Sequence, residues 1–482
     1  MWFNGSERLF LRKIEKNGHV FFNEIPNIPK TFQRIEDIGW FKRKDLKPTH
    51  NLKVIFKSIR NHLAANTVGT TRDEVLAQQL INLIFCKILD ERLTSLEDIV
   101  KFRVGVDEPL KEVKKRIFDL FQKVQQNQIN VFDVNDKIIL DTNSIVYVVG
   151  ELQNYSLIDT ERDVIADAFE TFIGHSLKGS QGQFFTPRNV VKMIVEILNP
   201  DEKEKIIDPA CGSGGFLIES LKFIWDKLSK QSSELGWSDV QIENKKMEIA
   251  TKNFRGIDKD YFLTKVTKAY MNLIGDGKTG IFCEDTLENP QNWSIQTRSH
   301  IQLGEFDILM TNPPFGSRIS VSGEAKLKEF ELGYQWKQKQ NQFYKTQKVK
   351  RTPPQELFIE RCLQLLKTGG KMAIILPETY LHAPSKKYIF QYLQQNNNIM
   401  AIIDLPQNTF RPFCGVKTCL ILIQKNTPQQ NDILMGVAEQ IGHDHKGDLI
   451  YRFDEQNKKF TTEIWDDTKA IRKEFKIGRA HV

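Results

Sequence analysis

Hydrophobic positions recur along this chain with two different periods. Apolar residues return every three to four positions within 71–88, 110–124 and 159–173, which predicts amphipathic helices. From about residue 205 onward, short apolar runs alternate with helical stretches instead. Strands that alternate with helices favour a mostly parallel sheet covered on both faces. The expected strands are 205–207, 255–258, 281–283, 306–310, 372–376, 399–404 and 418–423.

The change from amphipathic helices to apolar strands that alternate with helices sets the expected domain boundaries. Residues 1–60 mix short apolar runs with basic clusters and stay unassigned, residues 61–175 are expected to form an α-helical domain, and residues 176–476 an α/β domain. Residues 477–482, Ile-Gly-Arg-Ala-His-Val, match the translation of a widely used sequencing adapter. We therefore expect the helix begun at residue 466 to break off at Lys476, and residues 477–482 to be a non-native tail without a part in fold or function.

Composition narrows the class of protein. Of 482 residues, 40% are hydrophobic and 27% charged, which excludes a chain that is mainly disordered. No apolar run approaches the roughly 18 residues of a membrane-spanning helix, and the start lacks a secretion signal. The six cysteines are scattered, with no Cys-x-x-Cys or Cys/His cluster, so we expect a reduced, cytoplasmic protein without a metal site. A net charge of +7 permits an anionic partner but does not establish one.

A glycine-rich turn follows the first strand of the α/β domain. The segment Asp-Pro-Ala-Cys-Gly-Ser-Gly-Gly occupies residues 208–215. Its glycines allow a ligand to approach the backbone, and the acidic residue at the strand tip can accept hydrogen bonds. Taken alone, the turn fits a purely structural role equally well. A P-loop is disfavoured because no Gly-Lys-Ser/Thr follows, and the spacing is not that of a nicotinamide site.

Two carboxylates follow at the next two strand tips. Asp258 suits the two hydroxyls of a ribose, and Asp285 could contact an adenine ring. Each alone is more simply explained as a solvated loop residue. In this order behind the glycine turn, they predict a nucleoside-binding crevice at the carboxyl ends of the strands.

The segment Asn312-Pro313-Pro314-Phe315 carries the most specific chemistry. Two adjacent prolines stiffen the chain and can aim the Asn312 side-chain oxygen and the Pro313 carbonyl at one point. An exocyclic amine placed there would donate both hydrogens, which leaves its lone pair free to attack a methyl group. Phe315 offers an aromatic face on which a base can stack. A proline-stiffened turn with a core phenylalanine becomes a poor explanation once the earlier motifs are considered.

These motifs resemble those of the adenine-N6 DNA methyltransferases, in particular the modification (methylase) subunit of type I restriction-modification systems. A Phe-Thr-Pro element, the glycine turn and Asn-Pro-Pro-Phe follow in the order of the gamma group of amino-methyltransferases. The resemblance implies S-adenosylmethionine as cofactor and a seven-stranded, doubly wound methyltransferase sheet behind a helical domain. It places Asn312 to Phe315 on a flipped-out adenine. The cofactor-binding residues that it implies are Gln183, Phe184, Phe185, Thr186, Pro187, Arg188, Asp208, Ala210, Cys211, Gly212, Ser213, Gly214, Asp258 and Asp285.

The same resemblance implies double-stranded DNA as substrate and a separate specificity subunit that recognises the target, with a restriction subunit as a further candidate partner. Three alternatives remain open: a stand-alone type II DNA methyltransferase, a protein-glutamine methyltransferase, and a non-catalytic DNA-binding scaffold subunit.

A basic stretch close behind the Asn-Pro-Pro-Phe segment is a candidate DNA contact. Residues 334–355 contain no acidic residue, and aromatic side chains interleave with the basic ones. We expect a loop that lines the DNA path by phosphate contacts, although a lysine- and glutamine-rich loop can equally be solvated. The candidate residues are Lys337, Lys339, Lys345, Lys348, Lys350 and Arg351.

Overall fold

The chain forms two compact units. Unit 1 comprises residues 1–179 with 268–274, and unit 2 comprises residues 180–267 with 275–482. Among the described residues, no helix combines the length and apolar character needed to cross a membrane. The computed structural model describes residues 2–3, 8–9, 11–16, 19–24, 34, 38–68, 72–127, 131–133, 135–160, 164–165, 168–169, 186–274, 280–314, 320–412, 414–428 and 432–480.

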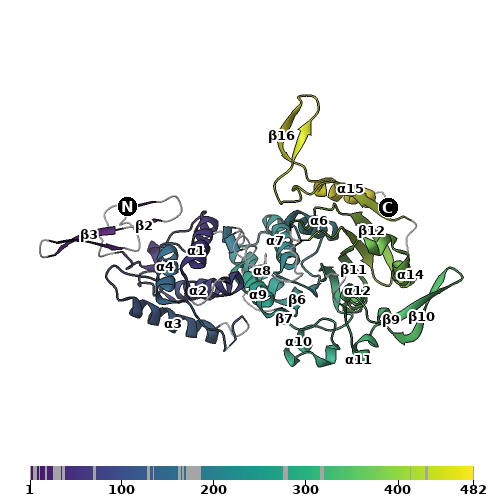
Figure 1. Ribbon diagram of the computed structural model, residues 1–482, viewed down its shortest axis with the longest axis horizontal. Helices are drawn as coiled ribbons and strands as arrows, with labels where there is room; N and C mark the ends of the chain where they lie inside the picture. The colour runs from purple at the N-terminus through teal and green to yellow at the C-terminus, as the bar shows by residue number, and fades with distance from the viewer. Residues whose placement is uncertain are drawn as a thin grey trace. The chain divides into compact units, whose positions relative to one another are not determined.

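Unit 2 is built on one large sheet of eight described strands in the order β14-β12-β13-β11-β8-β5-β6-β7 (Figure 1). Neighbouring strands are parallel except at β13, which runs antiparallel to both β11 and β12. The predicted mixed α/β fold with a mostly parallel sheet is confirmed. The strands are β5 (Ile206–Asp208), β6 (Phe254–Asp258), β7 (Ile281–Cys283), β8 (Phe306–Thr311), β11 (Leu366–Pro377), β12 (Asn398–Asp404), β13 (Thr418–Gln424) and β14 (Leu434–Val437).

The prediction of seven strands is one too few. The eighth strand is β14, which pairs in parallel with β12 at the edge of the sheet. Its alternating burial, with Met435 and Val437 exposed, is that of a partly covered edge strand. Residues 434–437 lack the continuous apolar run that is typical of buried central strands, so the sequence pattern did not predict this strand.

Helices of unit 2 pack against this sheet and place its loops. Helix α7 packs on β5 and β6, α12 on β11, and α14 on β12. Each of these helices connects two strands, so the segments that follow β5, β6, β7 and β8 all emerge at the carboxyl edge of the sheet. The helices are α6 (Arg188–Leu198), α7 (Gly215–Leu235), α8 (Asp239–Asn253), α9 (Tyr261–Ile274, ending in unit 1), η3 (Pro290–Asn292), α10 (Ile295–His300), α11 (Glu324–Leu327), η4 (Glu331–Gly333), α12 (Pro354–Leu365), α13 (Thr379–His382), η5 (Pro384–Lys386), α14 (Lys387–Asn396) and α15 (Thr468–Ala480).

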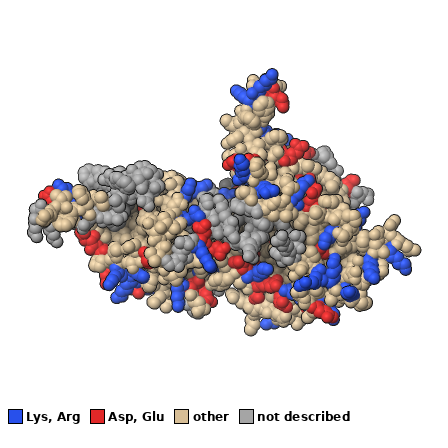
Figure 2. Space-filling view, viewed as in Figure 1, with Lys and Arg blue, Asp and Glu red and all other residues tan. Residues whose placement is uncertain are grey.

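Two hairpins extend from unit 2. The first pairs β9 (Tyr334–Lys339) with β10 (Gln342–Val349), and lysine and arginine side chains gather over it (Figure 2). The expectation of a loop at residues 334–355 is therefore wrong for most of this stretch. The second hairpin pairs β15 (Tyr451–Asp454) with β16 (Lys459–Ile464).

The C-terminal helix α15 packs against α6 through its apolar face. Ile471 and Phe475 are buried, as their spacing predicted, and Arg472 forms an ion pair with Glu196. The helix does not break off at Lys476, because its backbone continues to Ala480. That residues 477–482 are a non-native tail without a part in fold or function stays a prediction.

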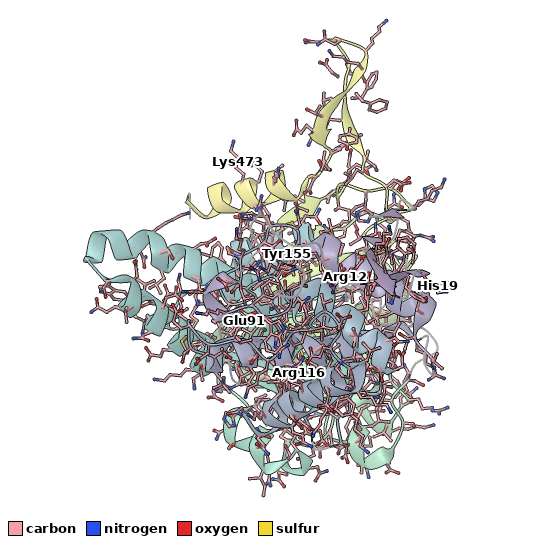
Figure 3. The ribbon with its side chains drawn as sticks, turned by 90° about the vertical axis from the view of Figure 1, so that its left-hand side faces the viewer. Arg12, His19, Glu91, Arg116, Tyr155 and Lys473 are labelled. Carbon is pink, nitrogen blue, oxygen red and sulfur yellow. The ribbon has the colours of Figure 1, made fainter. Side chains whose placement is uncertain are left out.

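Unit 1 contains a group of helices. Its α2 was expected to bury one face only, but every residue from Gln79 to Glu91 is buried. That burial includes Lys87 and Glu91, whose charged ends lie 3.1 Å apart (Figure 3 labels Glu91). Because the side chains that cover α2 come from distant segments, the helical period alone could not predict its full burial. The elements are β1 (Trp2–Phe3), β2 (Arg8–Leu9), β3 (Leu11–Lys16), β4 (His19–Glu24), η2 (Arg43–Asp45), α1 (Leu52–Asn66), α2 (Asp73–Leu93), α3 (Leu110–Asn127) and α4 (Thr142–Leu152).

Candidate active site

The glycine turn after β5 is held by hydrogen bonds to β6 and α9. Its Cys211 amide donates to the Ile257 carbonyl at 2.9 Å, and the Thr267 hydroxyl donates to the Gly212 carbonyl at 2.6 Å. Gly212 and Gly214 have φ angles of 52° and 86°, which glycine adopts without strain. A Cβ at Gly214 would lie 2.7 Å from Thr267, whereas a Cβ at Gly212 would meet nothing within 4 Å. The backbone at Gly212 therefore borders open space.

Asp208 links the tips of β5 and β8. Its side chain is buried and accepts hydrogen bonds from the Thr311 hydroxyl at 2.8 Å and from the Ala210 amide at 3.1 Å. Burial raises the pKa of this carboxyl to about 7, although both hydrogen bonds act in the opposite direction. Burial also raises the pKa of the Cys211 thiol, so this thiol stays protonated and is not a nucleophile.

Asp208→Asn should make stability less sensitive to pH. Because the folded pKa lies above the ordinary value of 3.8, the folded state binds the proton more tightly, and the stability from this group is lost as pH rises from about 4 through 7. The free energy of unfolding of the variant minus that of the wild type should therefore rise over this range, by an amount on the order of 4 kcal/mol. Urea unfolding of both proteins between pH 4.5 and 8 measures the difference, and a pH-independent difference would contradict the assignment.

The Asp258 carboxylate is held by two hydrogen bonds and can accept further ones. One carboxylate oxygen accepts from the Gly212 amide at 2.9 Å and the other from the Asp260 amide at 2.9 Å. Partial burial raises the pKa of this carboxyl, and the two backbone hydrogen bonds lower it. A carboxylate has about four lone-pair positions, so two remain for an incoming diol.

Asp285 is bound differently from Asp258. Its oxygens accept hydrogen bonds from the Lys326 ammonium at 2.6 Å and from the Leu287 backbone amide at 3.0 Å. The side chain of Asp285 is 45% exposed. A contact between Asp285 and an adenine ring stays a prediction.

Asn312 lies immediately beyond the tip of β8. Its amide nitrogen donates to the Thr186 hydroxyl at 3.2 Å, which joins the Phe-Thr-Pro element to the Asn-Pro-Pro segment across 126 positions of sequence. Its amide oxygen is buried and has no hydrogen-bond partner among the described residues. An unsatisfied buried acceptor costs about 1–3 kcal/mol, so this oxygen is poised to accept from a ligand.

The remaining predicted residues of the site fall into two groups. Ala210 and Ser213 lie in the glycine turn, Pro313 and Pro314 follow Asn312, and Pro187 precedes α6, whose first residue is Arg188. Four others lie outside the described residues: Gln183, Phe184, Phe185 and Phe315.

Sequence reasoning missed three residues that shape the site. Thr311 holds Asp208, and Thr267 holds the glycine turn. Gly256 allows close packing, because a Cβ there would lie 2.8 Å from Leu217 and 3.1 Å from the Cys211 sulfur. Only the position of Thr311 directly before Asn312 could have drawn attention to it.

The basic candidates do not all occupy equivalent positions. Lys337, Lys339, Lys348, Lys350 and Arg351 are exposed on or next to the β9–β10 hairpin. Lys345 instead lies 3.3 Å from Glu331 and over the ring of Tyr334. Five of the six basic side chains are therefore exposed without this ion pair, and DNA contact by them stays a prediction.

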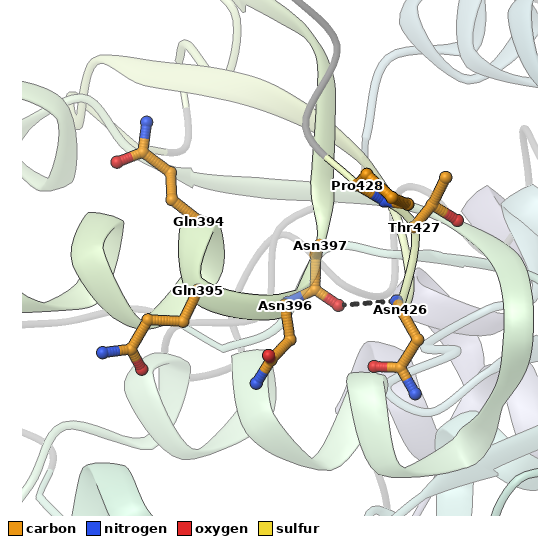
Figure 4. Close-up of a pocket in the computed structure, with 7 residues that line it drawn as sticks. All are labelled: Gln394, Gln395, Asn396, Asn397, Asn426, Thr427 and Pro428. Carbon is orange, nitrogen blue, oxygen red and sulfur yellow. Dashed lines mark hydrogen bonds between the residues drawn. The ribbon is translucent and has the colours of Figure 1, made fainter.

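A polar pocket of about 570 Å³ lies elsewhere in unit 2 (Figure 4). It adjoins Asn398 at the start of β12 and Gln424 at the end of β13, and therefore the amino edge of the sheet. Within this pocket the side-chain oxygen of Asn397 accepts a hydrogen bond from the backbone amide of Asn426 at 3.2 Å. The pocket has no charged side chain, so it offers no chemistry comparable to that of the strand-tip site. Its lining consists of Gln394, Gln395, Asn396, Asn397, Asn426, Thr427 and Pro428.

The mostly parallel sheet, with polar residues at the carboxyl ends of its strands, defines an α/β protein of the Rossmann-like class. Within that class the chain belongs to the N-6 DNA methylase family, whose model matches residues 160–477. The predicted resemblance to type I methylase subunits is confirmed by curated relatives. The chain is 26% identical to the EcoEI methylase subunit of Escherichia coli over 56% of its own length and 48% of that protein. It is 24% identical to the EcoKI methylase subunit of E. coli K12 over 72% of its length and 63% of that protein.

A combined type II restriction enzyme and methyltransferase, RM.Eco57I of E. coli, is 23% identical over 88% of this chain and 47% of that protein. The chain thus spans about half the length of the EcoEI methylase subunit and of RM.Eco57I.

Solved structures show the same fold. A chain from a type I restriction-modification system has a TM-score of 0.60 at 20% identity, covering 89% of this chain and 83% of that one. The type I methyltransferase subunit of Streptococcus thermophilus has a TM-score of 0.56 at 16% identity, covering 89% of this chain and 98% of that one.

Proposed function

We propose that this chain transfers a methyl group from S-adenosylmethionine to the N6 amine of an adenine flipped out of double-stranded DNA, as a modification subunit. The buried side-chain oxygen of Asn312, which has no partner among the described residues, carries this proposal, because an exocyclic amine is the donor that would satisfy it. Membership of the N-6 DNA methylase family supports the choice of adenine. Transfer of radiolabelled methyl groups to DNA, with protein substrates assayed in parallel, tests it.

The residues around the glycine turn fit the proposed cofactor. The open backbone at Gly212 allows close approach, and Asp258 has the free acceptor positions that a ribose diol needs. Asp208 offers a buried carboxyl beside them, and Thr186 of the Phe-Thr-Pro element is hydrogen-bonded to Asn312. Bound S-adenosylmethionine would supply a methyl group activated by its sulfonium.

The chain itself would act by positioning. The Asn312 oxygen and the Pro313 carbonyl would hold the adenine amine, and this fixes the direction of its lone pair. Thr186 keeps the Asn312 amide in place for this task. Extrusion of the base costs a few kcal/mol, which contacts within the pocket offset. Phe315 is proposed to stack on the extruded ring.

The alternatives can be separated by experiment. A protein-glutamine methyltransferase would label protein rather than DNA, and a scaffold subunit would bind no cofactor in calorimetry. The observation behind the third alternative, a stand-alone type II enzyme, is the similarity to RM.Eco57I along most of this chain. As a modification subunit, the chain would work in the cytoplasm with a specificity subunit and a restriction subunit.

The purified chain should bind the cofactor but methylate DNA poorly without a specificity subunit. This follows from its similarity to type I methylase subunits, for which target recognition is expected to be separate. Methyl transfer to plasmid DNA, measured with and without a specificity subunit, provides the comparison. Efficient site-specific methylation by the chain alone would favour the stand-alone enzyme.

A further inference from the structure

The β9–β10 hairpin has two faces of different character. Residues opposite each other in an antiparallel pair lie on the same face. Lys345 is opposite Trp336 and Phe343 is opposite Gln338, and these four form the inner face. The outer face consists of Lys337, Lys339, Gln342 and Tyr344.

Contacts within unit 2 hold the inner face. The ring of Trp336 stacks on that of Tyr388 in α14, with centroids 5.7 Å apart. The side chain of Gln391, also in α14, donates to the Phe343 carbonyl at 2.6 Å and accepts from the Phe343 amide at 2.7 Å. Lys345 lies within 3.3 Å of Glu331. The two aromatic residues of the inner face, Trp336 and Phe343, are therefore held by the protein itself, whereas Gln338 stays exposed and Lys345 is tied to Glu331.

The root of the hairpin is fixed to α12 through buried carboxylates. Glu360 accepts from the amides of Glu331 and Leu332, both at 2.9 Å. Glu356 is fully buried and accepts from Tyr388, the residue on which Trp336 stacks. A hairpin anchored to two helices keeps its outer face in a defined orientation.

The outer face is basic and open to solvent. All four of its residues are exposed, and Tyr344 keeps 47% of its surface. Gln340 and Asn341 close the hairpin with φ angles of 49° and 64°, so the tip is a tight turn with amide side chains. The chain reaches β9 after Asn312 and continues from β10 into α12, so the hairpin belongs to the same inter-strand connection as the site.

We propose that this outer face and tip lie in the major groove of the DNA substrate. The major groove is about 12 Å wide and admits a two-stranded ribbon. Lys337 and Lys339 would contact phosphates, while Gln342 and the amides of the tip would reach base edges. The proposal rests on the proposed function in one respect, namely that DNA is the substrate.

Three lysine variants of the chain test the two faces. Binding to a fluorescent 30-base-pair duplex is measured as a function of salt concentration. Lys337→Ala and Lys339→Ala should each reduce the slope of log K against log salt by about 1, because each removes one phosphate contact. Lys345→Ala is the matched control on the inner face and should leave the slope unchanged. Equal effects on both faces, or none, would overturn the proposal.

Two duplexes with modified cytosines test whether the hairpin lies in the major groove. One carries 5-hydroxymethylcytosine and the other its bulky glucosylated form, which fills the major groove without changing the phosphates. The wild type should bind the glucosylated duplex about tenfold more weakly, the loss expected for one or two base-edge contacts. The Gln342→Ala variant, which lacks a proposed base-edge contact, should show a smaller difference. Equal wild-type affinity for both duplexes would overturn the placement in the groove.

Methyl transfer by the wild type, assayed in parallel with its specificity subunit, separates the two proposals. If no methyl group reaches DNA, the proposed function fails. If transfer proceeds while the outer-face variants keep wild-type salt slopes, the hairpin proposal alone fails.

Discussion

Asn312→Ala should lower the rate of methyl transfer by about 10²–10³-fold or more, while cofactor affinity stays close to that of the wild type. The variant removes the buried oxygen that has no partner among the described residues, and with it the proposed acceptor for the adenine amine. The glycine turn and Asp258 are untouched, because their hydrogen bonds do not involve Asn312. Single-turnover methyl transfer and calorimetric titration with the cofactor measure the two quantities separately.

Thr186→Val is the matched control for this prediction. It removes the acceptor for the Asn312 amide nitrogen but leaves the Asn312 oxygen in place. Its rate should fall by only about tenfold, because one neutral hydrogen bond contributes about 0.5–1.5 kcal/mol. Wild-type rates in Asn312→Ala, assayed with any required partner, would contradict the catalytic assignment.

Asp258→Ala should weaken cofactor binding by about 10²-fold, the consequence of losing roughly 3 kcal/mol. Hydrogen bonds to charged groups contribute about 1.5–3 kcal/mol each, and Asp258 makes one to the Gly212 amide of the turn. The variant would thus loosen the turn and also remove the proposed ribose acceptor. Isothermal titration with S-adenosylmethionine gives the dissociation constant.

Asp226→Ala provides the control, since Asp226 is exposed on α7, the helix that follows the turn. Its affinity should match the wild type. Unchanged affinity in Asp258→Ala, with the fold verified by circular dichroism, would exclude Asp258 from the cofactor site.

The sequence by itself determined the order of the strands along the chain and the chemistry at their tips. The short apolar runs before Asp208, Asp258 and Asn312 all became strands, because a short continuous apolar segment suits a strand that is covered on both faces. The positions of these polar residues at the carboxyl ends followed directly. Local pattern and turn chemistry suffice for such features.

Only the tertiary structure decided which distant residues meet. The contact between Thr186 and Asn312 joins positions 126 residues apart, and no local pattern encodes it. The edge strand β14 and the full burial of α2 likewise depend on neighbours from elsewhere in the chain. The hairpin of residues 334–349 was mistaken for a loop because its strands are mostly polar. What makes it a hairpin with two unlike faces is the packing of Trp336 and Phe343 against α14, a non-local interaction that composition cannot predict.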